Sequence, residues 1–189
     1  MAHLSVAEIA EMARQIIQVR FADWLENTVF TWRWWLLLAV LIVPWIIWYR
    51  TTRKNHIINA VIFAMIMAVM AIFFDEFFYS LSCWTYPHDV IPVLPRLSSV
   101  DYTAIPLIFT VVYQHFSDWK RFFWVTIAVS TVASFVGEPL VVRGGMYVLV
   151  KWNYFYSWPI YIAMPICAKW LTELIVDIER RTINNRTGK

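Results

Sequence analysis

Charged side chains are scarce in this sequence. Only 15% of its 189 residues are charged and 60% are hydrophobic, whereas about a quarter of the residues in soluble domains are charged. Such a composition is typical of a protein that is solvated mainly by lipid. At about 20 residues per crossing, several spans with short connections use nearly all of the chain, which excludes a separate soluble catalytic domain. The net charge of +3 is small and dispersed, which gives nucleic-acid binding no support.

Several other signals are absent. The two cysteines, Cys83 and Cys167, lie in different apolar segments, which argues against a disulfide and against a zinc site made of thiolates. The sequence has no internal repeat, no low-complexity tract and no cofactor motif, so it identifies no cofactor and leaves a bound metal open as an alternative. Residues 1–30 lack the basic start and early apolar stretch of a cleavable signal peptide. We therefore expect the first span to direct membrane insertion.

The first thirty residues predict an amphipathic helix. Ser5 followed by Glu8 forms a capping box, so the helix should begin near residue 5. Its polar face extends into the apolar one at Arg20 and Asp23. The apolar face consists of Val6, Ile9, Met12, Ala13, Ile16, Ile17 and Trp24. Two alternatives stay open: the helix lies in the headgroup layer, or it docks against the spans of the protein itself.

Five apolar segments follow and predict five transmembrane helices. They cover residues 34–49, 57–74, 100–116, 122–142 and 154 to about 176. Their length favours helices over a membrane β-barrel, whose strands need only about 10 residues each. We expect an all-α integral membrane bundle made of an amphipathic interfacial helix (residues 1–31), a five-helix transmembrane domain (32–176) and a cytoplasmic tail (177–189).

The distribution of basic residues predicts the orientation. With five spans, ten Lys and Arg residues fall on one side and six on the other. The larger group consists of Arg50, Arg53, Lys54, Lys120, Arg121, Lys169, Arg180, Arg181, Arg186 and Lys189. The positive-inside rule then places the N-terminus outside and the C-terminus in the cytoplasm of a cell membrane.

Four carboxylates lie at the ends of apolar runs: Asp75 and Glu76 end the second, Asp101 opens the third and Glu138 lies near the end of the fourth. With five spans all four share the outer side, where charges turn away from lipid and mark sites. Asp75 and Glu76 point about 100° apart on a helix, so only one of the two should face a ligand. This pattern predicts an outward-facing acidic pocket with the binding residues Asp75, Glu76, Asp101, Tyr102, Glu138 and Arg143. The outer-loop side chains that could close it are His88, Asp89 and Arg96.

The sequence Gly137-Glu138-Pro139 is the sharpest local feature. Pro139 has no N–H to bond the carbonyl of Phe135, so the helix is interrupted beside an acid. Broken helices of this kind line ion and substrate sites in transporters. The alternative interpretation is an acid at a span end that pairs with Arg143 or with water.

Three motifs cover these polar positions: FFD at residues 73–75, SVDYTAIPLIF at 99–109 and GEPL at 137–140. With these motifs the chain resembles an uncharacterised family of small multi-pass membrane proteins from endospore-forming Bacilli and Clostridia, from the first span to the last. The resemblance implies a helical membrane fold and a bacterial membrane location, and it transfers no catalytic role.

These observations support three functional hypotheses. In the first, the acidic pocket binds or transports a cation or a small polar solute; the acids together with His88 would also suit a divalent cation. In the second, the protein is an enzyme whose membrane-embedded carboxylic acid protonates a lipid or isoprenoid, with aromatic faces stabilising a carbocation. In the third, it is a structural or partner-binding protein whose N-terminal helix and residues 173–181 bind other subunits or form a homo-oligomer. Membrane lipid is a partner in all three hypotheses.

Overall fold

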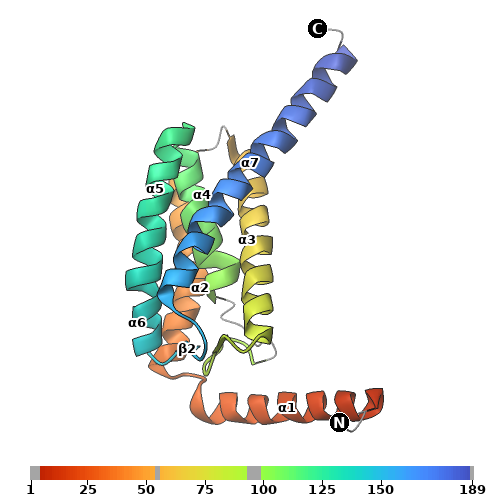
Figure 1. The fold of residues 1–189 in the computed structure, drawn as a ribbon, viewed down its shortest axis with the longest axis vertical. Coiled ribbons are helices and arrows are strands. Elements are labelled where there is room, and N and C mark those ends of the chain that lie inside the picture. The colour runs from red at the N-terminus through yellow and green to blue at the C-terminus, as the bar shows by residue number, and fades with distance from the viewer. Residues whose placement is uncertain (1–4, 54–55, 93–98, 188–189) are drawn as a thin grey trace.

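A computed structural model of the chain shows a bundle of long helices with one further helix lying across its end (Figure 1). It describes residues 5–53, 56–92 and 99–187. The crossing helix is α1 (Val6–Asn27), and the bundle consists of α2 (Trp32–Thr51), α3 (Ile57–Ser80), α4 (Ile105–His115), α5 (Trp119–Val132), α6 (Glu138–Arg143) and α7 (Tyr154–Thr187). Two π-helical turns, η2 (Val100–Ala104) and η3 (Ala133–Gly137), lead into α4 and α6. The strands β1 (Trp84–Thr85) and β2 (Val148–Leu149) connect the helices at the α1 end.

The prediction of an all-α membrane bundle is confirmed. Four helical segments are long and apolar enough to cross a membrane: α2, α3, the α5–η3–α6 segment and α7. The shorter η2–α4 segment lies among them in the same bundle (Figure 1). Large apolar side chains project outward from these helices, for example Met65, Val69 and Phe73 on α3. A helix that is apolar on all sides is typical of a membrane span.

Helix α1 begins as the sequence predicts. The hydroxyl oxygen of Ser5 accepts a hydrogen bond from the backbone N–H of Glu8, and the Glu8 carboxylate accepts one from the backbone N–H of Ser5. None of the α1 residues is buried, and within the part of the chain that the structure describes Val6, Ile9, Met12, Ile16 and Ile17 of its apolar face are at least half exposed. An uncovered apolar face suits the headgroup layer of a membrane.

The C-terminal half of α1 also docks on the loop that follows β1. Arg20 Nη2 lies 2.9 Å from Asp89 Oδ2, and Trp24 Nε1 donates to the Asp89 carbonyl at 2.9 Å. Thr28 Oγ1 is hydrogen-bonded to His88 Nδ1 at 3.0 Å. The two expectations for this helix are therefore compatible, because its end docks on the protein while its apolar face stays free for lipid.

The contacts of this loop correct one expectation. His88 and Asp89, which the sequence suggested for closing a pocket, hold α1 instead, and Arg96 lies outside the residues that the structure describes. Burial raises the pKa of Asp89 to about 7, against the opposing effect of Arg20.

The connection between α6 and α7 folds back into the bundle. Gly145 has a φ of 70°, a left-handed conformation that glycine adopts without strain, and Arg33 Nε donates to the neighbouring Gly144 carbonyl at 2.7 Å. After this turn β2 pairs with β1 in antiparallel register, with Trp84 opposite Leu149. The sequence did not predict these strands, because two residues per strand give no periodicity to detect.

Buried apolar side chains form two clusters. The first core contains Leu37, Trp84, Tyr86, Val90, Met146 and Tyr147. The second core contains Phe63, Met67, Phe109, Val112, Phe122, Met164 and Ala168. The first core includes the strand β1 and the connections at the α1 end, whereas the second core packs α3, α4, α5 and α7 together.

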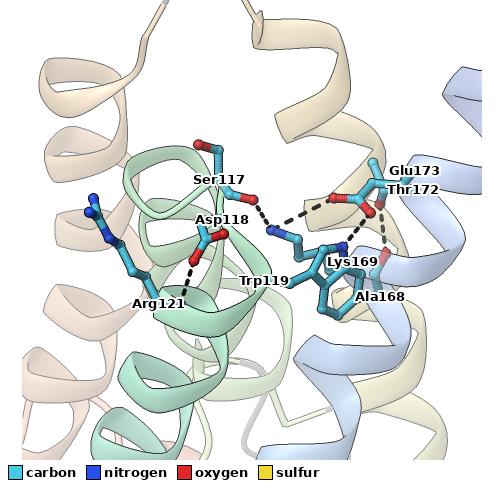
Figure 2. A network of polar contacts seen from close by, with 8 residues as sticks. All are labelled: Ser117, Asp118, Trp119, Arg121, Ala168, Lys169, Thr172 and Glu173. Carbon is cyan, nitrogen blue, oxygen red and sulfur yellow. Dashed lines mark hydrogen bonds and ion pairs between the residues drawn. The ribbon is translucent and has the colours of Figure 1, made fainter.

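Lys169, which the sequence analysis counts among the cytoplasmic charges, is buried at the end of the bundle opposite α1. The side chain of Lys169 is 0% exposed, and its Nζ donates to the backbone carbonyl of Ser117 at 2.5 Å (Figure 2). The same atom lies 3.7 Å from Glu173 Oε1 and 4.6 Å from the centre of the Phe122 ring. Beyond this point α7 continues past the other helices as far as Thr187 (Figure 1).

Candidate functional site

A cavity of about 600 Å³ lies between the two cores. Its wall includes Trp84, Tyr86 and Tyr147 from the first core and Phe109 and Met164 from the second. We call it the inter-core cavity. Its polar lining consists of Asp75, Asp101, Glu138, Tyr86, Tyr147, Ser157 and Tyr161.

Asp75 reaches the cavity from the last turns of α3 and is 5% exposed. Its Oδ1 accepts hydrogen bonds from Trp84 Nε1, at 3.0 Å, and from the Tyr86 hydroxyl. Both donors are neutral, so they fix the position of the carboxylate without cancelling its charge.

Asp101 lies in η2, in front of Pro106, and is 8% exposed. A proline cannot donate to the helix ladder, and its ring clashes with the carbonyl four residues earlier. The helix widens here, so that the N–H of Ile105 bonds the carbonyl of Val100, five residues back. Single π turns of this kind are frequent at functional sites.

Glu138 follows η3 in the same arrangement, because its N–H bonds the carbonyl of Ala133 and Pro139 comes next. Its Oε2 accepts a hydrogen bond from Ser157 Oγ at 3.0 Å, and Trp152 Nε1 donates to Ser157 Oγ at 2.8 Å. Tyr161 lines the same cavity one helical turn after Ser157. A chain of neutral donors from the start of α7 therefore holds this second carboxylate.

Two tyrosines from the loops lie close to the acids. Burial raises the pKa of Tyr147, and the negative charges of Glu138, Asp75 and Asp101 raise it further. Burial also raises the pKa of Tyr86, with Asp101 and Asp75 adding to the effect. Both phenols therefore stay protonated, and the Tyr86 hydroxyl donates a hydrogen bond to Asp75.

The cavity combines negative charge with apolar walls. Among the residues that the structure describes, no Lys, Arg or His lines it. The remaining wall is mainly aliphatic and aromatic, including Ile108 from α4 and Val132 from α5. These two side chains are also 48% and 60% exposed. The cavity therefore reaches the lateral surface between α4 and α5, where lipid would lie.

The structure brings three of the six predicted binding residues to this wall: Asp75, Asp101 and Glu138. The half-buried Glu76 and Tyr102 do not line the cavity, and Arg143 is exposed. Glu76 follows Asp75 in the chain, and Tyr102 follows Asp101. Because neighbouring side chains on a helix point about 100° apart, they do not face the cavity together with the residues before them. Ligand binding by any of the six stays a prediction.

Sequence reasoning missed Tyr147, Ser157 and Tyr161. Tyr147 lies in a loop that Gly145 turns inward, and loop positions have no periodicity that predicts burial. Ser157 and Tyr161 are four residues apart on α7, so they share a helix face. This spacing of two polar side chains in an apolar helix was the sequence signal that could have indicated them.

The divalent-cation hypothesis is not supported by the geometry. Within residues 5–53, 56–92 and 99–187, no three His, Cys, Asp or Glu side chains are grouped so as to hold a metal ion. His88, which this hypothesis required beside the acids, is hydrogen-bonded to Thr28 and does not line the cavity.

Comparison with known proteins returns no match: no protein-family model, curated protein or solved structure is similar to the chain at a significant level.

Proposed function

We propose that this membrane protein binds a cation or small polar solute in the inter-core cavity and serves in its binding or transport. The observation that supports this function is the convergence of Asp75, Asp101 and Glu138 from three helical segments on one cavity. Because charges interact strongly in a medium of low dielectric constant, such a wall favours a positively charged occupant.

The apolar part of the wall refines the expected ligand. Ligand pockets use apolar surface for contact and a few polar groups for orientation. Here the carboxylates lie near the first core, while Ile108, Phe109 and Met164 line the rest of the cavity. An organic cation with an apolar body fits this division better than a small hydrated ion, and the opening between α4 and α5 gives it a route from the lipid.

Orientation and family membership are parts of the same proposal. The excess of Lys and Arg on one side supports an outward-facing acidic end, with the N-terminus outside and the C-terminus cytoplasmic. The resemblance to the family from endospore-forming bacteria rests on motifs that contribute Asp75, Asp101 and Glu138 to the cavity wall.

Equilibrium binding of tetraphenylphosphonium to the purified protein in neutral detergent tests this function. We expect saturable binding, and we expect the neutral, similarly shaped triphenylphosphine oxide to bind at least about tenfold more weakly, because only the cation gains from the carboxylates. Glu138→Gln and Asp101→Asn should each weaken binding of the cation by about tenfold, since each removes one charge while keeping the volume.

The matched control is Glu76→Gln, which removes the same charge next to Asp75 but outside the cavity wall. Its binding constant should stay within about twofold of the wild-type value. Unchanged tetraphenylphosphonium binding by both Glu138→Gln and Asp101→Asn would refute the proposal, and so would equal losses in these variants and in Glu76→Gln.

A second candidate function is acid catalysis on an isoprenoid, which the aromatic wall favours. The rings of Phe74, Phe78, Trp84 and Trp152 line the cavity beside the acids, and aromatic faces stabilise nearby cations. A carboxylic acid would protonate one double bond, a second double bond would close the ring, and the carboxylate would take the proton back. Incubation with geranylgeraniol should then yield an isomer of identical mass that Glu138→Gln no longer forms.

A further inference from the structure

A second cavity, of about 450 Å³, lies at the end of the bundle opposite α1. It is lined by α3, α4, α7 and the segments next to them. The basic side chains in its wall are Arg53, Lys169 and Arg180, and the acidic ones are Glu173 and Asp177. The neutral polar side chains are His56, Asn59, Tyr113, Gln114 and Ser117. This wall is therefore rich in hydrogen-bond donors and carries more positive than negative charge.

Gln114 is a buried residue in the wall of this cavity. It lies near the end of α4 and is 8% exposed. Its Oε1 accepts a hydrogen bond from Thr52 Oγ1 at 3.2 Å. Its Nε2 is buried and has no hydrogen-bond partner among the described residues. Buried polar groups are almost always hydrogen-bonded, so this donor is suited to an acceptor atom that occupies the cavity.

The charge next to it is held in place by neighbouring groups. The ammonium group of Lys169 is fixed by the Ser117 carbonyl and by Glu173, and Glu173 Oε2 in turn accepts from Trp119 Nε1 at 2.8 Å (Figure 2). Arg53 and Arg180 are exposed at the rim, where long side chains can turn toward a ligand. A fixed cation inside and exposed guanidinium groups at the rim suit an anion of several oxygens.

We propose that this cavity binds a phosphoryl group, with Gln114 Nε2 and Lys169 inside and Arg53 and Arg180 at the rim. Phosphate oxygens are strong acceptors that bond both amide donors and guanidinium groups. Basic pockets between transmembrane helices bind lipid headgroups in this way. Inorganic phosphate and the headgroup of an anionic phospholipid offer the same chemistry, so the test has one arm for each.

Thermal unfolding of the full-length protein in neutral detergent separates these sources. In one arm inorganic phosphate is titrated at constant ionic strength; in the other, dioctanoyl phosphatidic acid is compared with dioctanoylglycerol, which has the same tails and no phosphate. A rise in Tm with inorganic phosphate identifies a free anion as a ligand. A rise with phosphatidic acid alone identifies a lipid headgroup. No rise with either probe, or an equal rise with dioctanoylglycerol, would overturn the proposal.

Variants locate the binding. Gln114→Leu removes the buried donor at similar volume, and we expect it to raise the apparent dissociation constant of the active probe about tenfold. Arg180→Gln, at an exposed position, should raise the apparent dissociation constant severalfold. If Gln114→Leu does not fold, the result for Arg180→Gln tests the location of the binding site. The control is Lys120→Gln, which removes an exposed charge from α5 outside the cavity wall. Equal effects of Arg180→Gln and Lys120→Gln would contradict this location.

Discussion

The two ends of the bundle bury charge of opposite sign, and they stabilise it in different ways. Near α1, Asp75 accepts hydrogen bonds from Trp84 and Tyr86, and Glu138 accepts one from Ser157, and these donors are neutral. At the other end, Lys169 has the carboxylate of Glu173 beside it. Neutral donors fix a charge and leave its field in place, whereas an opposite charge cancels much of it. The first end therefore presents carboxylates that neutral donors hold, whereas Lys169 at the second end is fixed between the Ser117 carbonyl and Glu173.

The strongest way to break this contrast is to remove the buried lysine. Lys169→Ala leaves the Ser117 carbonyl without its donor and opens a void, so we expect a loss of about 3 kcal/mol in the free energy of unfolding. This is the low end of the range for buried pairs, because the Glu173 side chain is 42% exposed and water can replace part of the contact. Equilibrium unfolding in mixed micelles measures the change.

Lys169→Met and Lys151→Ala are the controls. Methionine keeps most of the volume, so its difference from alanine gives the packing contribution of the Lys169 stem. Lys151 is exposed at the α1 end, and its change to alanine should cost less than about 0.5 kcal/mol. A similarly small loss for Lys169→Ala would show that the buried ammonium group does not hold α7 in place.

The acidic end should respond to loss of an acceptor more than to loss of charge. Asp75→Ala removes the acceptor of Trp84 and Tyr86, and we expect a loss of about 2 kcal/mol in the free energy of unfolding. Asp75→Asn keeps an oxygen that accepts both bonds, so its loss should stay below about 1 kcal/mol. Equal losses in the two variants, measured by the same unfolding assay, would show that the charge itself stabilises the fold.

The last expected effect is the pH dependence of the docking of α1. Folding raises the pKa of Asp89 from its ordinary value of 3.8 to about 7, so the folded state binds this proton more tightly than the unfolded state. The stabilisation is fully present below about pH 4 and is lost as the pH rises through about 7. The Tm of wild type should therefore fall over this range relative to the Tm of Asp89→Asn.

The difference between the two proteins isolates Asp89 from its neighbour His88. Burial lowers the pKa of His88, which has the opposite sign and is common to both proteins. If the Tm difference between wild type and Asp89→Asn is constant between pH 4 and pH 8, the carboxyl group has no raised pKa in the folded protein.

The sequence predicts the helical bundle because backbone N–H and C=O groups must be hydrogen-bonded within the chain when they lie in lipid. Long apolar runs leave helices as the only structure that satisfies their backbone groups in a membrane, and four of the spans have the required length in the structure. The pairing of β1 with β2 depends on backbone groups that meet only after the chain has folded. No local sequence pattern at Trp84 or Val148 predicts that pairing.

Part of the candidate site could be predicted from the sequence. Asp75, Asp101 and Glu138 stand out because an acid next to an apolar run is rare, but the sequence does not tell which neighbour faces inward, so Glu76 and Tyr102 were included with them. Lys169 shows the reverse case. It lies within the apolar stretch of α7, where an ionisable residue should have been taken as buried and paired, and it was counted with the cytoplasmic charges instead.

The two π turns have a consequence for how such a protein changes over time. Each holds one residue more than the α-helical turn that it replaces, which in genetic terms equals the insertion of a single codon. Loss of one codon within residues 133–137 would restore a regular helix and rotate the preceding part of the segment by about 100° relative to Glu138. The direction of the acid is therefore encoded by chain length as well as by side-chain identity, and lineages that differ by one residue here would present different walls to the same cavity.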